Sequence, residues 1–116
     1  MKDNEITIGD LKKQVDAFVD ERDWKQFHSP KNLAMSISIE ASELMEIFQW
    51  LDLDEAKDII KSDTKERAEV LDEISDVVIY AIAFCNRNKI DLSEAIKEKM
   101  KKNIKKYPAE KFKGKL

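Results

Sequence analysis

The sequence predicts an all-α protein, a bundle of four helices, on three observations. Two glycines and two prolines among 116 residues are too few for the many tight turns of a strand-rich fold. Apolar residues make up 42% of the chain and recur at helical spacing, segregated from the charged 39%. Helix-start signals precede the apolar stretches. The length predicts a single domain, residues 1–116, with a basic tail from about residue 105 to 116.

The first two helices are marked by their caps. Thr7 and Asp10 form a cap in front of a first amphipathic helix, which fades after Trp24. Ser29 is a strong N-cap, and the proline that follows it suits the first position of a helix. We therefore expect a second helix over residues 30–51.

The second half of the chain predicts two more long helices. A polar, acidic segment comes first, with one short helix at about residues 55–61. Thr64 caps a third long helix that ends near residues 86–88. Asp91 caps a fourth helix, which stops before Pro108. Short connections between these helices are typical of a bundle.

Composition excludes several kinds of function. With one cysteine, Cys85, no intramolecular disulfide can form, and we expect a cytoplasmic protein. One histidine, His28, and one cysteine are too few for a structural zinc site. The longest apolar run, residues 77–85, is too short to span a membrane. A net charge of −3 does not favour nucleic acid as a partner, and no glycine-rich phosphate loop is present.

One pair of acids lies within the apolar stripe of the second predicted helix. At about 100° per residue, Ile47 and Leu51 fall within about 20° of Glu40, and Glu43 lies about 60° to one side. Glu40 is therefore in the middle of the apolar face, where a helix normally carries no charge.

The third predicted helix repeats this pattern. Tyr80 and Phe84 fall within about 20° of Glu73, and Asp76 lies about 60° away. Residues 33–51 and 70–85 contain no lysine or arginine that could pair with these acids. Buried carboxylates without a partner cost several kcal/mol each, and neighbouring ones repel. The two acid pairs, Glu40 with Glu43 and Glu73 with Asp76, therefore predict a cation site between the two helices.

Oxygen ligands favour Mg²⁺, with Mn²⁺ as a substitute. A di-iron bundle would need Glu-x-x-His motifs, and His28 lies outside both acid pairs. Protein-bound Mg²⁺ commonly meets phosphate groups, so the residues alone indicate Mg²⁺-dependent chemistry on a phosphorylated substrate.

Four segments carry a resemblance to a known family. They are Glu21–Leu33, which includes Arg-Asp-Trp and Phe-His; Glu40–Leu44 with Phe48–Trp50; Glu73–Val77 with Tyr80; and Lys99–Pro108. In these segments the chain resembles the all-α nucleoside triphosphate pyrophosphohydrolases, the MazG-like family. The Arg-Asp-Trp and Phe-His segment is most similar to the dCTP pyrophosphatase branch. The similarity covers about residues 10–108.

The resemblance implies hydrolysis of a (d)NTP between its α and β phosphates, with dCTP or a related deoxynucleotide as the substrate, to give the monophosphate and pyrophosphate. It implies a role in clearing the nucleotide pool. It implies that Mg²⁺ binds at Glu40, Glu43, Glu73 and Asp76. It further implies substrate contacts at Trp24, His28, Lys31, Trp50, Tyr80, Lys99, Asn103 and Tyr107.

The chain departs from the family pattern at two positions. Ile39 stands where many relatives carry the glutamate expected to act as the base, so Glu43, followed by Glu46, is the candidate catalytic base. Val15 stands near the place of a polar, base-contacting residue and cannot make that hydrogen bond.

Two further expectations concern assembly and the rival function. Residues 77–85 are apolar on every face, more than one small bundle needs to cover, which predicts a homodimer or a tetramer with pocket residues from two chains. The alternative function is a non-catalytic helical interaction module whose acids hold a structural cation.

Overall fold

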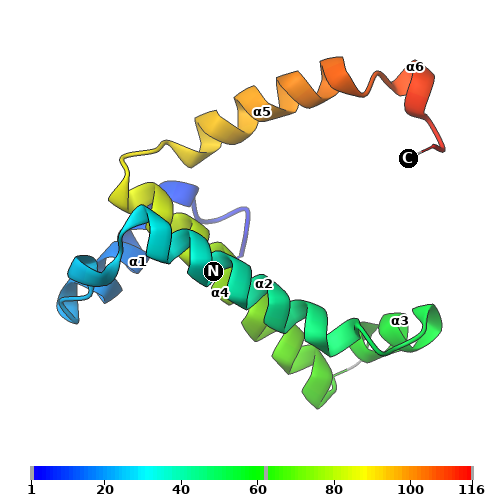
Figure 1. The fold of residues 1–116 in the computed structure, drawn as a ribbon, viewed down its shortest axis with the longest axis horizontal. Coiled ribbons are helices and arrows are strands. Elements are labelled where there is room, and N and C mark those ends of the chain that lie inside the picture. The colour runs from blue at the N-terminus through cyan, green and yellow to red at the C-terminus, as the bar shows by residue number, and fades with distance from the viewer. Residues whose placement is uncertain (1, 62, 116) are drawn as a thin grey trace.

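The centre of the fold is a pair of long antiparallel helices, α2 and α4, seen side by side in Figure 1. The computed structural model describes residues 2–61 and 63–115, and over these residues it contains helices and connecting turns. The helices are α1 (Ile8–Glu21), the short 3-10 helix η1 (Lys25–Phe27), α2 (Pro30–Phe48), α3 (Leu53–Lys61), α4 (Lys65–Arg87), α5 (Leu92–Lys106) and α6 (Ala109–Phe112). The prediction of an all-α fold is confirmed.

The four predicted N-caps are present. The Thr7 hydroxyl accepts from the Asp10 N–H, and the Asp10 carboxylate accepts in return from the Thr7 N–H. The remaining caps each accept from the backbone N–H three residues on; they are Ser29, Thr64 and Asp91. These caps satisfy N–H groups that the first turn of a helix leaves without partners.

Several boundaries differ from the prediction. Helix α1 ends at Glu21 and not after Trp24. Helix α2 ends at Phe48 and not at residue 51, so Trp50 lies in the link to α3. Helix α3 begins at Leu53 because Asp52 and Glu55 form a capping box: the Asp52 N–H donates to Glu55 Oε1 (3.0 Å) and the Glu55 N–H to Asp52 Oδ1 (2.8 Å). The short helix α6 follows Pro108 within the predicted basic tail.

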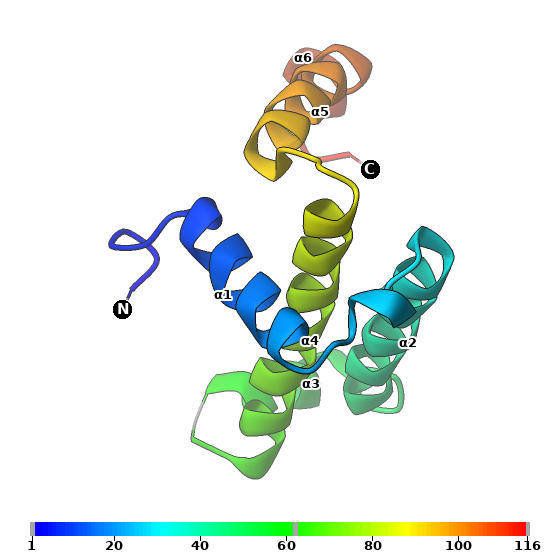
Figure 2. The same cartoon turned by 90° about the vertical axis from the view of Figure 1, so that its left-hand side faces the viewer.

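The buried core lies where α1 and α2 meet the C-terminal half of α4. Figure 2 shows α1 crossing α4 at an angle, opposite the side that α2 covers. Two side-chain bonds fix this crossing: the Asn86 amide donates to the Lys12 carbonyl (2.9 Å), and the Lys12 ammonium donates to the Ile90 carbonyl (2.7 Å). The apolar side chains that are buried within the described residues are Val19, Leu33, Ile82, Ala83 and Cys85.

The prediction of a four-helix bundle is met only in part, because α5 does not pack into it. Figures 1 and 2 both show α5 and α6 set away from the paired helices. The chain exposes 9581 Å², against about 6,500 Å² for a compact monomer of its mass. Its radius of gyration is 17.1 Å, against about 13 Å for a compact domain of this length. The apolar surface of a single chain is therefore incompletely covered.

The helices of residues 2–61 and 63–115 include none that combines the length and the apolar character needed to cross a membrane.

Candidate functional site

Three carboxylates from the two central helices converge at one point. Glu40 stands on α2, and Glu73 and Asp76 stand one turn apart on α4. One oxygen of each side chain lies within 4.8 Å of the others. The convergence follows from the spacing, because residues three apart share a helix face and α2 packs lengthwise against that face of α4. We call these three residues the carboxylate cluster.

The surroundings of the cluster disfavour negative charge. Burial is the main cause that raises the pKa of Glu40, and the neighbouring Glu43 raises it further. Burial also raises the pKa of Glu73, to about 7, with the nearby Glu43 and Glu40 adding to the effect. Both effects have the sign expected for acids that lose water and meet like charges.

No basic group among the described residues pairs with the cluster. Among residues 2–61 and 63–115, no ion pair uses Glu40, Glu73 or Asp76. The Oε2 atoms of Glu40 and Glu73 are buried without a hydrogen-bond partner. Such orphaned carboxylate oxygens, in an all-oxygen donor set, fit a hard divalent cation such as Mg²⁺ or Mn²⁺.

The two candidate bases occupy different places. Glu43 is exposed, yet it lies close enough to the cluster to raise the pKa of both Glu40 and Glu73. Glu46, almost one turn further along α2, is exposed and does not belong to the cluster. Glu43 is therefore the better positioned of the two to act on a group held at the cluster.

A groove of about 1030 Å³ lies between α1 and α4, and Asp76 is the member of the cluster that lines it. Asp76 belongs to both the cluster and the groove wall, and Tyr80 stands one turn beyond it on α4. Trp24 and His28 come from the segment that links α1 to α2. Four of the predicted site residues thus line one groove. Its remaining lining is mostly apolar and includes Val15.

Aromatic contacts orient Trp24 at the groove. The Trp24 and Phe18 rings meet edge to face, with centroids 5.7 Å apart. The Arg22 guanidinium covers the Phe18 ring at 3.8 Å from its centroid. Such contacts restrict the motion of the Trp24 indole, which stays partly exposed.

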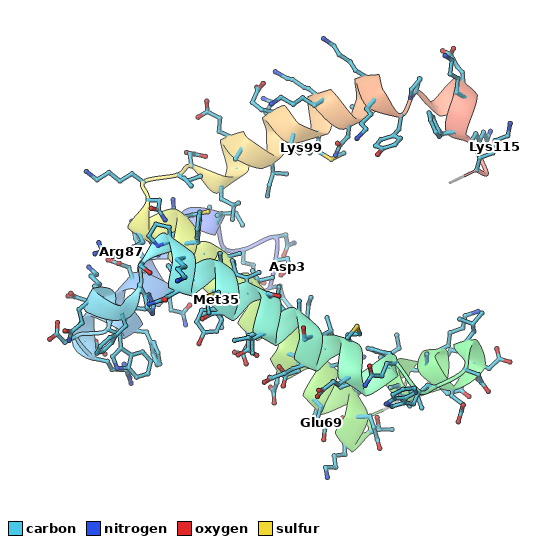
Figure 3. All side chains as sticks on the ribbon, viewed as in Figure 1. Asp3, Met35, Glu69, Arg87, Lys99 and Lys115 are labelled. Atoms are coloured by element: carbon cyan, nitrogen blue, oxygen red, sulfur yellow. The ribbon has the colours of Figure 1, made fainter. Side chains whose placement is uncertain are left out.

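The other predicted substrate residues do not reach this groove within one chain. Trp50 is 86% exposed in the link between α2 and α3, and Lys31 lies exposed in the first turn of α2. Figure 3 shows Lys99 on α5, away from the paired helices. Asn103 on the same helix and Tyr107 at its end share that position.

Arg87, which was not among the predicted site residues, lines a small cavity beside His28. The helical wheel contained a signal, since Arg87 falls on the same face of α4 as Asp76 and Tyr80. A basic residue in the last turn of a helix is normally explained by its interaction with the helix dipole. For this reason the sequence alone did not mark Arg87 as a site residue. Burial lowers the pKa of His28, and the positive charge of Arg87 lowers it further.

Comparisons with known proteins agree with this architecture. A model of the MazG-like family matches residues 35–115. The chain is 39% identical to dCTP pyrophosphatase 1 of Mus musculus over 119 residues, covering 95% of this chain and 64% of the mouse protein. It is 41% identical to the Homo sapiens protein of the same name over 105 residues, covering 90% and 61%. The chain thus spans under two thirds of the length of these curated relatives.

A solved structure matches most of the chain. The crystal structure of a pyrophosphatase from Archaeoglobus fulgidus superimposes with a TM-score of 0.81 at 41% identity. The match covers 93% of this chain and 98% of that one.

Proposed function

The chain belongs to the MazG-like family, and we propose that it is a Mg²⁺-dependent nucleoside triphosphate pyrophosphohydrolase. The substrate would be a (d)NTP, with dCTP or a related deoxynucleotide preferred, and the products the monophosphate and pyrophosphate. The observation that carries the proposal is the carboxylate cluster with its two orphaned oxygens, of which one member, Asp76, also lines the groove that contains Trp24 and Tyr80. The relatives named dCTP pyrophosphatase support the choice of substrate.

Each part of the site has a role in this reaction. Glu40, Glu73 and Asp76, with Glu43 beside them, would hold the cation. When bound, a divalent cation would neutralise part of the phosphate charge and would make water a better nucleophile at neutral pH. Trp24 and Tyr80 would hold the base and sugar in the groove, so that the phosphates lie toward Asp76.

Hydrolysis adds one water across the anhydride. The water oxygen forms a bond to phosphorus, and the bond from phosphorus to the oxygen that bridges the α and β phosphates breaks. Glu43 would accept the proton that the water loses, because it is the carboxylate that lies beside the cluster without belonging to it. The pyrophosphate leaves with the electron pair of the broken bond.

We also propose that the working form is a homodimer or tetramer. The excess exposed area and the lone helix α5 support this assembly. Ile96, Met100 and Ile104 form an apolar stripe on α5, each at least half exposed. Residues 97–116 contain nine lysines against two glutamates, and residues 52–76 contain ten acids against four bases. In this assembly α5 of one chain would pack on residues 52–76 of a neighbouring chain. This packing would bring Lys99, Asn103 and Tyr107 toward the carboxylate cluster of that neighbour.

A panel of nucleotides tests the proposed function. Eight (d)NTPs are incubated with the protein and Mg²⁺, and release of pyrophosphate is measured for each. We expect release from at least one deoxynucleotide, with dCTP among the best. If no nucleotide is hydrolysed with Mg²⁺ or Mn²⁺, the interaction module with a structural cation replaces the enzyme.

We place the enzyme in the cytoplasm, where the reduced state of its buried Cys85 is maintained.

A further inference from the structure

A second cavity, of about 70 Å³, lies at the end of the groove remote from the carboxylate cluster. It adjoins the groove, and the residues that line both are Val15, Val19, His28 and Ala83. Its volume admits a few water molecules and not a nucleobase. A ligand in the groove could therefore present only one edge to it.

Lys25 and Asp16, which line this cavity, pair with each other, whereas the guanidinium of Arg87 has no such partner among the described residues. The Lys25 ammonium lies 3.4 Å from Asp16 and 3.5 Å from Asp20. The Asn86 amide donates to the Lys12 carbonyl. No hydrogen bond or ion pair within residues 2–61 and 63–115 uses the guanidinium of Arg87. The donors of Arg87 are therefore available to a ligand.

Arg87 is placed to meet the base end of a bound nucleotide. It lies on the face of α4 that carries Asp76 and Tyr80, about 16 Å beyond Asp76 along the helix axis. Figure 3 shows Arg87 near the C-terminal end of α4. Side chains on a helix lean toward its N-terminus, which directs Arg87 back toward Tyr80. With the phosphates at Asp76, the sugar and then the base would extend toward Arg87.

The electrostatics of the cavity suit an uncharged ligand edge better than a phosphate. The acids beside Lys25 neutralise its charge, and the lowered pKa of His28 favours the neutral imidazole. Arg87 then supplies one positive charge, with its donors in a fixed fork. Such a fork matches two acceptor atoms that lie side by side, as it does for the O6 and N7 atoms of guanine in DNA.

We propose that Arg87 is a specificity residue that recognises the O2 and N3 atoms of cytosine. This inference rests on the proposed function for the placement of the nucleotide. Among the pyrimidines, cytosine offers those two adjacent acceptors, whereas in uracil and thymine the N3 atom carries a hydrogen.

Equilibrium binding of dCMP and dUMP tests this proposal, because the two ligands differ in the base alone. Titration calorimetry is done on the parent, Arg87→Gln and Arg87→Lys. We expect the parent to bind dCMP about tenfold more tightly than dUMP, the discrimination typical of a bidentate contact. Arg87→Gln should lose this preference, and Arg87→Lys should retain a small part of it. Lys89→Gln is the matched control, since Lys89 is an exposed cation near the same helix end that lines neither cavity.

Each outcome bears on one of the two proposals. Equal binding of dCMP and dUMP by the parent, or an unchanged preference in Arg87→Gln, overturns the role of Arg87. If Lys89→Gln also loses the preference for dCMP, the preference depends on the general positive charge at this helix end, and the role of Arg87 is overturned. Pyrophosphate release from dCTP is measured in parallel: a parent that prefers dCMP yet releases none contradicts the proposed reaction while supporting base recognition.

Discussion

Glu40 on α2 and Glu73 on α4 lie together between the paired helices, and each keeps a buried Oε2 atom that no group of the described residues contacts by a hydrogen bond. Burial raises the pKa of both carboxyl groups, the neighbouring Glu43 adds to both shifts, and Glu40 adds to that of Glu73, because like charges repel. Two such acids at a helix interface weaken the packing that holds them. Their presence is understandable if a cation joins them in the working protein.

Removing the charge of Glu73 should stabilise the metal-free protein. We expect Glu73→Gln to melt at a higher temperature than the parent in EDTA, because the amide is not subject to repulsion from Glu40. The same variant should gain less from added Mg²⁺, which stabilises the parent by binding the folded form. Thermal melts of both proteins in EDTA and in Mg²⁺ measure the two effects. A variant less stable than the parent in EDTA would mean that Glu73 has a stabilising partner in the protein.

The raised pKa of Glu73 also predicts how metal-free stability depends on pH. Below the ordinary value of 4.5, the folded and unfolded chains both hold the proton. Between 4.5 and about 7 the unfolded chain has lost this proton while the folded chain keeps it. The folded state then binds more protons, so stability falls as pH rises through this window and levels off above it.

Melts of the parent and Glu73→Gln in EDTA, at several pH values from 4 to 8, test this dependence. The difference in Tm between the two proteins should widen in favour of the variant from pH 4.5 to 7. A constant difference across the window would refute it.

Much of the fold follows from local signals, and this explains what could be predicted. Caps at Thr7, Ser29, Thr64 and Asp91 act within one turn, so the sequence alone locates the starts of the long helices. The Asp52 and Glu55 capping box is equally local, and its pattern is visible in the sequence. The prediction did not use this capping box. It therefore extended the second helix to residue 51 and placed Trp50 within that helix, whereas Trp50 lies in the link to α3.

The convergence of the acids could also be predicted, whereas the position of α5 could not. Glu40 and Glu73 each lie in an apolar stripe, and two such stripes must face each other to be buried. The stripe on α5 is equally apolar but does not specify which surface covers it, and that surface need not belong to the same chain. The placement of Lys99 and Asn103 relative to the groove therefore depends on packing beyond the single chain.

Neutralising one cluster residue at a time should remove activity without unfolding the protein. We expect Glu40→Gln and Asp76→Asn each to lower pyrophosphate release by at least about 100-fold, because each removes a charged oxygen that would hold the cation. Circular dichroism should show unchanged helical content. Glu46→Gln serves as the comparison on α2, and a loss as large in that variant would favour Glu46 over Glu43 as the base.

The exposed stripe on α5 predicts a specific defect in assembly. Met100→Asp places a charge in the middle of the stripe and should lower the molecular mass observed by light scattering at micromolar concentration. Met100→Leu keeps the apolar surface and should assemble like the parent. A parent that is monomeric and fully active under these conditions would contradict the proposed oligomer.

A site shared between chains also predicts complementation. Glu40→Gln and Lys99→Ala, each impaired alone, should recover activity when they are unfolded together and refolded as mixed oligomers. In mixed assemblies some sites combine an intact cluster from one chain with an intact α5 from another. If the mixture is no more active than the average of the two variants, the α5 residues act within their own chain or not at all.

The most direct test of the account is the identity of the products formed from dCTP in the presence of Mg²⁺, followed by phosphorus NMR with the parent and Glu40→Gln side by side. We predict that the parent converts dCTP to dCMP and pyrophosphate and that Glu40→Gln leaves dCTP unchanged over the same period. Formation of dCDP and orthophosphate, or the same products at the same rate from Glu40→Gln, would contradict a pyrophosphohydrolase built on the carboxylate cluster.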